Sequence, residues 1–380
     1  MKITTVRAEV VRVPFAYPKA WALGAAHDTT RAVIVVETDG GLIGVGEGPG
    51  EAWTVARIRE MAPLLVGLDP FDSEMRFAIL WGQGPAQYPR SALSAVGALD
   101  LACWDLVGQA CGQPLYRLLG GSVQPDAPIL GYVFLGAPEE MAASARRLVT
   151  EGISCLKVKL GVDATHDLVA IRAVREAAGP GITLIIDPNQ AWTERTALRQ
   201  IEQLTGPDLL YVEQPVGWAD VAALARIRHA SPVRIAADEA AFTRQELMRV
   251  LELHAADLLL VNPLDCGGIG ETQKILALAE LCGMEANTRA WSELGPGTAA
   301  MLHVYRSSPL MRYPLDTEYN YLAEDVVQAP LRLIAGRFEY LEAPGLGVQL
   351  DAARVDRLCV RQAAGEVQSP SQNVSRFRHY

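Results

Sequence analysis

The 380-residue chain is half hydrophobic and 21% charged, a composition typical of a well-packed globular protein. Its length allows a barrel of about 200–250 residues together with a second structural unit. The formal net charge of −10, without a long basic run, argues against nucleic acid and anionic membranes as partners. A small anionic substrate would therefore need a local positive charge, and a bound divalent cation is one way to supply it.

The cysteines and the apolar runs indicate the cellular compartment in which the protein is expected. None of the six cysteines belongs to a C-x-x-C pair, so free thiols in a reducing compartment are the simplest interpretation. No apolar run approaches the ~20 residues of a membrane span, and the first residues lack the apolar core of a signal peptide. We expect a cytoplasmic protein.

Residues 1–125 are expected to form a small α+β domain. Residues 3–13 and 31–37 alternate in a strand-like way, and a turn follows at residues 39–41. The stretch 17–28 between the two strands is expected to be irregular. From about residue 54 to residue 119 the pattern becomes helical, and a β-meander followed by helices is typical of an α+β unit.

Short apolar or β-branched runs alternate with helix-sized amphipathic stretches from about residue 128 onward. There are eight such runs, at residues 129–134, 155–160, 183–186, 209–212, 234–237, 257–261, 284–288 and 310–315. This alternation predicts a (β/α) barrel over residues 126–330. Residues 331–380 return to short strand-like pieces with a polar end, and we expect them to pack back on the first domain.

Polar residues stand just after five of these runs, 24 to 27 residues apart: Asp187, Glu213, Asp238, Asn262 and Arg289. A repeat of this length fits one strand, one helix and two short loops. Doubly wound sheets also alternate strands and helices, but eight evenly spaced units favour a closed barrel.

Lys157 and Lys159 stand two residues apart in the second predicted strand. Because side chains alternate along a strand, both lysines point to the same side, at the strand end that forms the barrel mouth. Two neighbouring ammonium groups repel each other, and a nearby metal adds to this, so the pKa of one should fall toward neutrality. A lysine in that state is a usable general base. The alternative is a pair of surface lysines on an edge strand.

Asp187, Glu213 and Asp238 follow three consecutive predicted strands. Neighbouring strands lie ~4.8 Å apart, so the three carboxylates can converge on one point. Mg²⁺ prefers such hard oxygen ligands and keeps positions free for water and substrate. Each acidic residue alone would fit a solvated helix cap, but their common register with the two lysines favours a metal site.

The same register continues beyond the carboxylates. Asn262 follows the sixth run and Arg289 the seventh, while Asp316 and Glu318 follow the eighth. These residues are candidates for substrate binding. The alternative is that Asn262 is a turn residue and Arg289 a solvated charge.

Several motifs together resemble the enolase superfamily, on the side of the mandelate racemase and muconate-lactonizing enzymes. They are GALDLACWDL (97–106), LLGG (118–121), KVK (157–159), DPN (187–189), EQP (213–215), ADE (237–239) and GGI (267–269). The resemblance spans roughly residues 1–350. It implies an α/β fold in which an α+β capping domain covers a modified (β/α)₇β TIM barrel, with one Mg²⁺ and an assembly of two or eight copies.

The resemblance also implies roles for particular residues. A proton beside a carboxylate is removed while the metal and nearby cations stabilise the resulting enediolate. Lys159 matches the base, Lys157 helps to hold the carboxylate, and residues 17–27 match a lid that closes over the substrate. The residues expected around the substrate are Asn189, Asn262, Arg289, Asp316, Glu318, Tyr132, His27 and Trp21.

Two positions depart from the usual residues of the family. Racemases of the muconate-lactonizing type carry a second lysine where this chain has Asn262. Mandelate racemase-like enzymes pair a histidine with an aspartate where it has Arg289 and Asn262. Arg289 stays protonated at ordinary pH and is a poor base. The third metal ligand is also open, because Glu239 adjoins Asp238 and relatives use either type of residue.

A missing second base favours chemistry on one face of the enediolate. The leading hypothesis is dehydration of a hydroxy or sugar acid, because residues 24–31 resemble the lid of acid-sugar dehydratases. The alternative within the family is a racemase, epimerase or lactonizing cycloisomerase. From another class, a barrel that binds a carboxylate without catalysis is possible in principle, although unused crowded charges argue against it.

Overall fold

The computed structural model describes residues 1–83, 89–204 and 208–360. Within these ranges no helix combines the length and apolar character that crossing a membrane requires. The polar end expected after about residue 363 lies outside the described residues.

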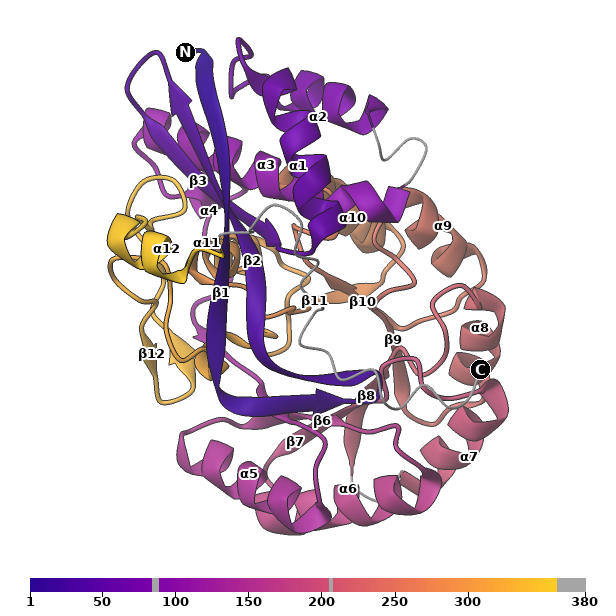
Figure 1. Ribbon diagram of the computed structural model, residues 1–380. Coiled ribbons are helices and arrows are strands. Elements are labelled where there is room, and N and C mark those ends of the chain that lie inside the picture. The colour runs from indigo at the N-terminus through magenta and orange to yellow at the C-terminus, as the bar shows by residue number, and fades with distance from the viewer. Residues whose placement is uncertain (84–88, 205–207, 361–380) are drawn as a thin grey trace.

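An antiparallel sheet and a layer of helices form the N-terminal part of the molecule (Figure 1). The strands β1 (Ile3–Trp21), β2 (Gly24–Thr38) and β3 (Ile43–Pro49) pair in chain order, and the helices are α1 (Ala52–Leu65), α2 (Ser73–Gly82), α3 (Pro89–Cys111) and α4 (Leu115–Leu118). α3 packs closely on β3: a Cβ added at Gly44 would lie 2.2 Å from the carbonyl oxygen of Ala102. The glycines of β3 thus let the helix approach the sheet.

The stretch 17–28 is not irregular, contrary to our expectation. β1 and β2 extend through it as a long hairpin that reaches from the N-terminal sheet across the barrel strands (Figure 1). The pairing continues past the proline-containing segment through one register shift between Pro14 and Lys19. The hairpin lies against the barrel loops, since the N–H of Leu135 donates to Ala20 O at 2.8 Å.

Seven parallel strands form the second sheet, in chain order from one edge to the other. They are β5 (Gly131–Val133), β6 (Cys155–Lys159), β7 (Thr183–Asp187), β8 (Leu209–Glu213), β9 (Arg234–Ala237), β10 (Leu258–Val261) and β11 (Glu285–Thr288). The alternating helices are α5 (Pro138–Thr150), α6 (Ala164–Ala178), α7 (Glu194–Leu204), α8 (Val221–Ala230), α9 (Arg244–Glu252), α10 (Ile269–Leu281) and α11 (Gly295–Ser307). The helices lie outside the curled sheet (Figure 1). Seven of the eight predicted runs are therefore strands of one parallel sheet.

The eighth run, residues 310–315, is not a regular strand. It makes two isolated parallel bridges, Met311 to Ala286 beside β11 and Leu315 to Ile129 just before β5. Pro309 and Pro314 lack N–H groups, which limits continuous pairing. The segment nevertheless bonds to both edges of the seven-stranded sheet.

The remaining elements are short. β4 (Ala127–Pro128), β12 (Leu333–Ile334) and β13 (Arg337–Phe338) form a small antiparallel sheet, η1 (Tyr319–Tyr321) follows the eighth run, and α12 (Ala352–Leu358) ends the described chain. After α12 the chain returns to β1, where the N–H of Val360 donates to Val10 O at 2.7 Å. The exact domain boundaries at residues 125 and 330 stay a prediction.

Candidate active site

Lys157 lies among three carboxylates at the carboxyl end of β6. Its Nζ donates to Glu213 Oε1 at 2.6 Å and to Asp316 Oδ2 at 3.0 Å, and lies 3.4 Å from Asp187 Oδ2. Burial alone would lower the pKa of Lys157, but Asp316 and Glu213 outweigh it and hold that pKa well above its ordinary value. Lys157 is therefore a fixed cation, and the expected lowering does not apply to it.

Lys159 lies at the last position of β6, in register with Asp187 on β7. Its Nζ donates to Asp187 Oδ2 at 2.6 Å. Burial alone would raise the pKa of Asp187, but Lys159 and Lys157 lower it below the ordinary range. The strand register thus brings the predicted base beside a predicted metal ligand.

Buried carboxylates crowd together beside the two lysines. Burial and then repulsion from Asp187 raise the pKa of Glu213, and burial likewise raises the pKa of Asp238 against the opposing charge of Arg289. Within the described chain, Glu213 Oε2 and Glu239 Oε2 are buried without a hydrogen-bond partner. No three His, Cys, Asp or Glu side chains of the described residues already stand in a metal-binding arrangement. The unpartnered acidic oxygens still fit a divalent cation.

Asn262 and Arg289 are both buried and both held by the protein itself. Asn262 Nδ2 donates to Glu293 Oε1 at 2.6 Å and to Arg289 O at 3.1 Å. The guanidinium of Arg289 pairs with Asp238 at 2.6 Å and also donates to Asp265. These carboxylates hold the pKa of Arg289 well above its ordinary value although burial opposes them. Neither side chain is a solvated or merely turn-forming group.

Tyr132 and Asn189 also lie beside the charged centre. The Tyr132 hydroxyl donates to Asp316, and the Nζ atoms of Lys157 and Lys159 lie 5.2 and 5.3 Å from its ring centre. The N–H of Asn189 donates to Asp187 Oδ1 at 2.8 Å.

The structure does not join the two predicted lid side chains to the lysines. His27 is exposed on β2, and Trp21 is half-buried at the end of β1, packed over Gly24. The lid backbone is nevertheless close, since a Cβ added at Gly161, just after β6, would lie 2.9 Å from the Cβ of Ala22.

A third lysine, Lys19, enters the site from β1 and is only 5% exposed. Its Nζ donates to Glu318 and to the Ser292 hydroxyl, which itself donates to Glu318. Sequence reasoning missed Lys19 because it assigned this segment to a loop. A continuous strand pattern through residues 17–21 would have placed the side chain on the inward face.

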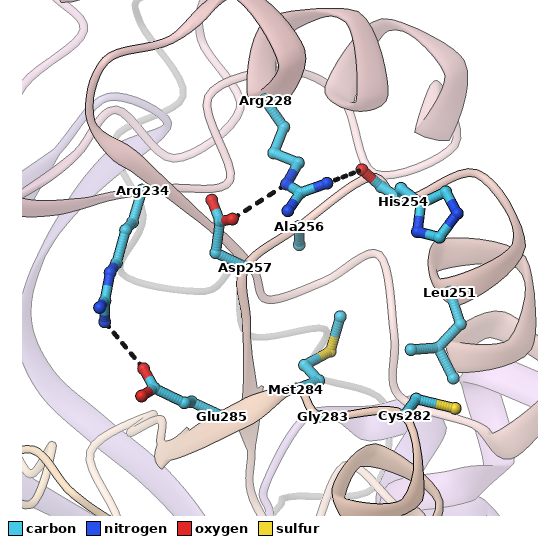
Figure 2. A pocket seen from close by; sticks show the side chains of 10 residues that line it. All are labelled: Arg228, Arg234, Leu251, His254, Ala256, Asp257, Cys282, Gly283, Met284 and Glu285. Atoms are coloured by element: carbon cyan, nitrogen blue, oxygen red, sulfur yellow. Dashed lines mark hydrogen bonds and ion pairs between the residues drawn. The ribbon is translucent and has the colours of Figure 1, made fainter.

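A cavity of about 300 Å³ lies at the opposite, amino ends of β9, β10 and β11 (Figure 2). Its charged groups pair with one another, Arg228 with Asp257 at 2.9 Å and Arg234 with Glu285 at 2.8 Å. Barrel enzymes place their catalytic groups at the carboxyl ends of the strands. The cluster around Lys159 is therefore the better candidate.

The fold and this cluster define a class of protein: a barrel enzyme with a capping domain, whose lysines and acidic residues meet at the carboxyl ends of the strands. Residues 2–120 match the family model of the mandelate racemase/muconate lactonizing enzyme N-terminal domain. Residues 140–354 match the model described as enolase C-terminal domain-like. The chain belongs to the mandelate racemase/muconate lactonizing enzyme group of the enolase superfamily.

Curated relatives of this chain include racemases, epimerases and cycloisomerases, which are isomerases. The chain is 29% identical to N-succinyl-L-Arg/Lys racemase of Bacillus cereus, over 95% of this chain and 99% of the relative. It is 29% identical to D-galactarolactone cycloisomerase of Agrobacterium fabrum, over 92% and 97% of the two chains. A dipeptide epimerase from Enterococcus faecalis V583, solved with Mg and the dipeptide L-Leu-L-Tyr, superposes with a TM-score of 0.85 at 30% identity, over 92% and 99%.

Proposed function

We propose that this enzyme is a magnesium-dependent cycloisomerase, which removes a proton beside a carboxylate from one face and opens or closes a lactone ring. The observation that carries the proposal is the fixed pair Asn262 and Arg289, where the family's second base would stand. Asn262 holds no titratable proton, and Arg289 is paired with two carboxylates. The relatives named above support isomerisation better than dehydration, our leading hypothesis from the sequence.

The metal would be held by Asp187, Glu213 and Asp238, with Glu239 as the alternative third ligand. When bound, Mg²⁺ supplies positive charge that holds the substrate carboxylate and offsets the negative charge that develops on it. Lys157 adds a second fixed positive charge beside the same oxygens. Asn189, which donates to Asp187, would help to shape this end of the site.

Lys159 would carry the transferred proton. In ring opening its Nζ takes the proton from the α-carbon. The electron pair of the broken C–H bond forms the double bond between the α- and β-carbons, and the bond from the β-carbon to the ring oxygen breaks, so that this oxygen leaves as part of a carboxylate. Ring closing reverses these movements, and Lys159 returns the proton to the same face. One base therefore suffices for both directions.

Racemisation is the competing function because relatives carry that name. It requires a proton donor on each face of the enediolate. Asn262 supplies none, and Lys157 is tied to three carboxylates.

Exchange of the substrate α-proton with D₂O tests the proposed role of Lys159. Proton NMR of a panel of sugar acids, lactones and unsaturated diacids should show Mg²⁺-dependent exchange or ring conversion for the wild type. Lys159→Met should slow it by about 10³-fold or more, because general-base catalysis contributes on this scale. Lys2→Met makes the same change at an exposed lysine of the N-terminal part and serves as the matched control. No exchange with any member of the panel would contradict the proposal.

The stereochemistry of exchange separates the two candidate reactions. Deuterium should enter with retention of configuration at the α-carbon. Inversion at a rate similar to exchange would show a second proton donor and favour racemisation.

The expected assembly of two or eight copies and the cytoplasmic location stay predictions. Light scattering on the purified chain distinguishes the two assembly sizes.

A further inference from the structure

Lys19 belongs to the capping sheet but contacts groups of the barrel. It pairs with Ala26 across the β1–β2 hairpin, and its ammonium contacts Ser292, which follows β11, and Glu318, which follows the eighth run. Phe15 and Phe134 face the same ammonium, with ring centres 4.0 and 5.6 Å from Nζ. The ammonium is therefore enclosed by two carbon-rich rings and one carboxylate.

The cluster of Lys19, Ser292 and Glu318 lies within the electrostatic reach of Lys159. Burial would raise the pKa of Glu318, but Lys19 and, more weakly, Lys159 bring it below the ordinary value. Burial is also the main cause of the lowered pKa of Lys19, and Lys159 adds to it. Aromatic contacts connect the two places, since Phe134, which faces the Lys19 ammonium, stacks on Tyr132 with 5.3 Å between ring centres, and the Tyr132 ring centre lies 5.3 Å from Lys159 Nζ. On the proposed function, a substrate whose reacting carbon lies at Lys159 therefore has this cluster beside it.

The two carboxylates that follow the eighth run, Asp316 and Glu318, each already accept a hydrogen bond from a lysine of the chain. Asp316 accepts from Lys157, and Glu318 accepts from Lys19. A substrate ammonium at this place would have to share Glu318 with Lys19 inside a buried site, where like charges repel strongly. A neutral acyl chain, a hydroxyl group or a ring oxygen meets no such repulsion.

We propose that Lys19 is a specificity-determining residue: by holding Glu318 it excludes substrates that carry a free ammonium group and favours N-acylated or nitrogen-free carboxylates. The inference rests on the proposed function for the place of the reacting carboxylate. It is selection by a repulsive element rather than by a new attractive contact.

Two ligands that differ only in the ammonium group test the proposal. N-Propanoyl-L-alanine is L-alanyl-L-alanine with hydrogen in place of the ammonium. Calorimetric titration of the full chain with Mg²⁺ present should show at least tenfold tighter binding of the propanoyl compound. Lys19→Met should shift the ratio of the two dissociation constants toward the dipeptide by tenfold or more, because Glu318 becomes free to accept the ammonium. Lys19→Arg keeps the cation and should retain the wild-type preference.

A double variant identifies the acceptor and protects the test against misfolding. Lys19→Met combined with Glu318→Gln removes both charges, so it leaves no unpaired buried ion and should lose the gain in dipeptide binding. Circular dichroism confirms that each variant is folded. An unchanged ratio in Lys19→Met, or binding of neither ligand to wild type and variant alike, overturns the inference. The proposed function fails on a different result, the absence of α-proton exchange, which calorimetry does not measure.

Discussion

At the residue scale, the two lysines on one face of β6 have different partners. Lys157 contacts three carboxylates, whereas Lys159 contacts Asp187 from the last position of its strand. A cation surrounded by acidic oxygens gives up its proton reluctantly, so Lys157 suits charge stabilisation. We therefore propose Lys159, at the strand end, as the proton carrier.

Substitution of each carboxylate by its amide distinguishes Asp238 from Glu239 as the third metal ligand. Asp238 is buried near Lys157 and Asp187, although it pairs with Arg289. We predict that Asp238→Asn weakens Mg²⁺ binding by about tenfold or more, because a charged ligand is lost. Glu239→Gln should change the affinity by less than about threefold. Calorimetric titration with Mg²⁺ measures both, and the opposite order would assign the ligand to Glu239.

At the element scale, acidic residues of the capping domain hold the amino ends of two barrel helices. Asp100 of α3 accepts from the N–H of Ile269 at the start of α10. Glu47 of β3 accepts at 2.8 Å from the N–H groups of Leu294 and Gly297, at the start of α11. A carboxylate satisfies the free N–H groups of a helix and offsets its positive end. The Glu47 contacts fix the end of the loop between β11 and α11, which carries Ser292.

His303 of α11 makes the folded state sensitive to acid. Its Nδ1 accepts from the N–H of Tyr116 in α4, and its Nε2 faces Leu346 O at 3.1 Å, so the ring is neutral. Burial is the main cause that lowers the pKa of His303 from 6.5 to about 4. Above pH 6.5 both states are neutral and stability is complete. As the pH falls from 6.5 toward 4, His303 becomes protonated in the unfolded state but stays neutral in the folded state. The free energy of unfolding therefore decreases over this range.

The difference between 6.5 and about 4 corresponds to a loss of about 3 kcal/mol. Urea unfolding between pH 7 and pH 4 measures it, with His303→Gln as the control, because glutamine can make both hydrogen bonds without titrating. The free energy of unfolding of the wild type should fall more steeply than that of the variant. Parallel curves would contradict the assignment.

At the scale of the whole molecule, the capping domain and the barrel touch backbone to backbone. A Cβ added at Gly97 of α3 would lie 2.5 Å from the carbonyl oxygen of Leu264. The N–H of Leu264 in turn donates to Asn262 Oδ1 at 3.0 Å. The packing of the two domains therefore supports the loop that holds a candidate substrate residue.

Gly97→Ala should destabilise the protein by about 2 kcal/mol, because the added methyl group must push α3 away from the barrel. Gly82→Ala is the control, since a Cβ at this helical glycine meets nothing within 4 Å. That variant should be neutral or more stable by up to about 1 kcal/mol. Chemical denaturation measures the free energy of unfolding of both variants. Equal values would show that the contact between α3 and the barrel can move apart without loss of stability.

Local pattern was sufficient for most of the barrel and insufficient where segments depend on distant partners. The seven strand-forming runs could be located because each is a short stretch of neighbouring apolar residues. The regular spacing between these runs then located the polar residues that follow them. The eighth run failed as a regular strand because Pro314 within it and Pro309 just before it lack N–H donors. The extension of β1 and β2 through residues 17–28 was missed, because the pairing continues past Pro14 and Pro18 only through a register shift.

The sequence by itself determined the family, the parallel sheet and which end of it carries the lysines and carboxylates, because these follow from spacing along the chain. Only the tertiary structure decided which charge meets which. In the structure Lys157 donates to Glu213 and Asp316. Other side chains of the protein hold Asn262 and Arg289 in place. Lys19, from the capping sheet, donates to Glu318. Lys19 and Glu318 stand 299 residues apart in the chain, and local pattern carries no information about contacts at that distance.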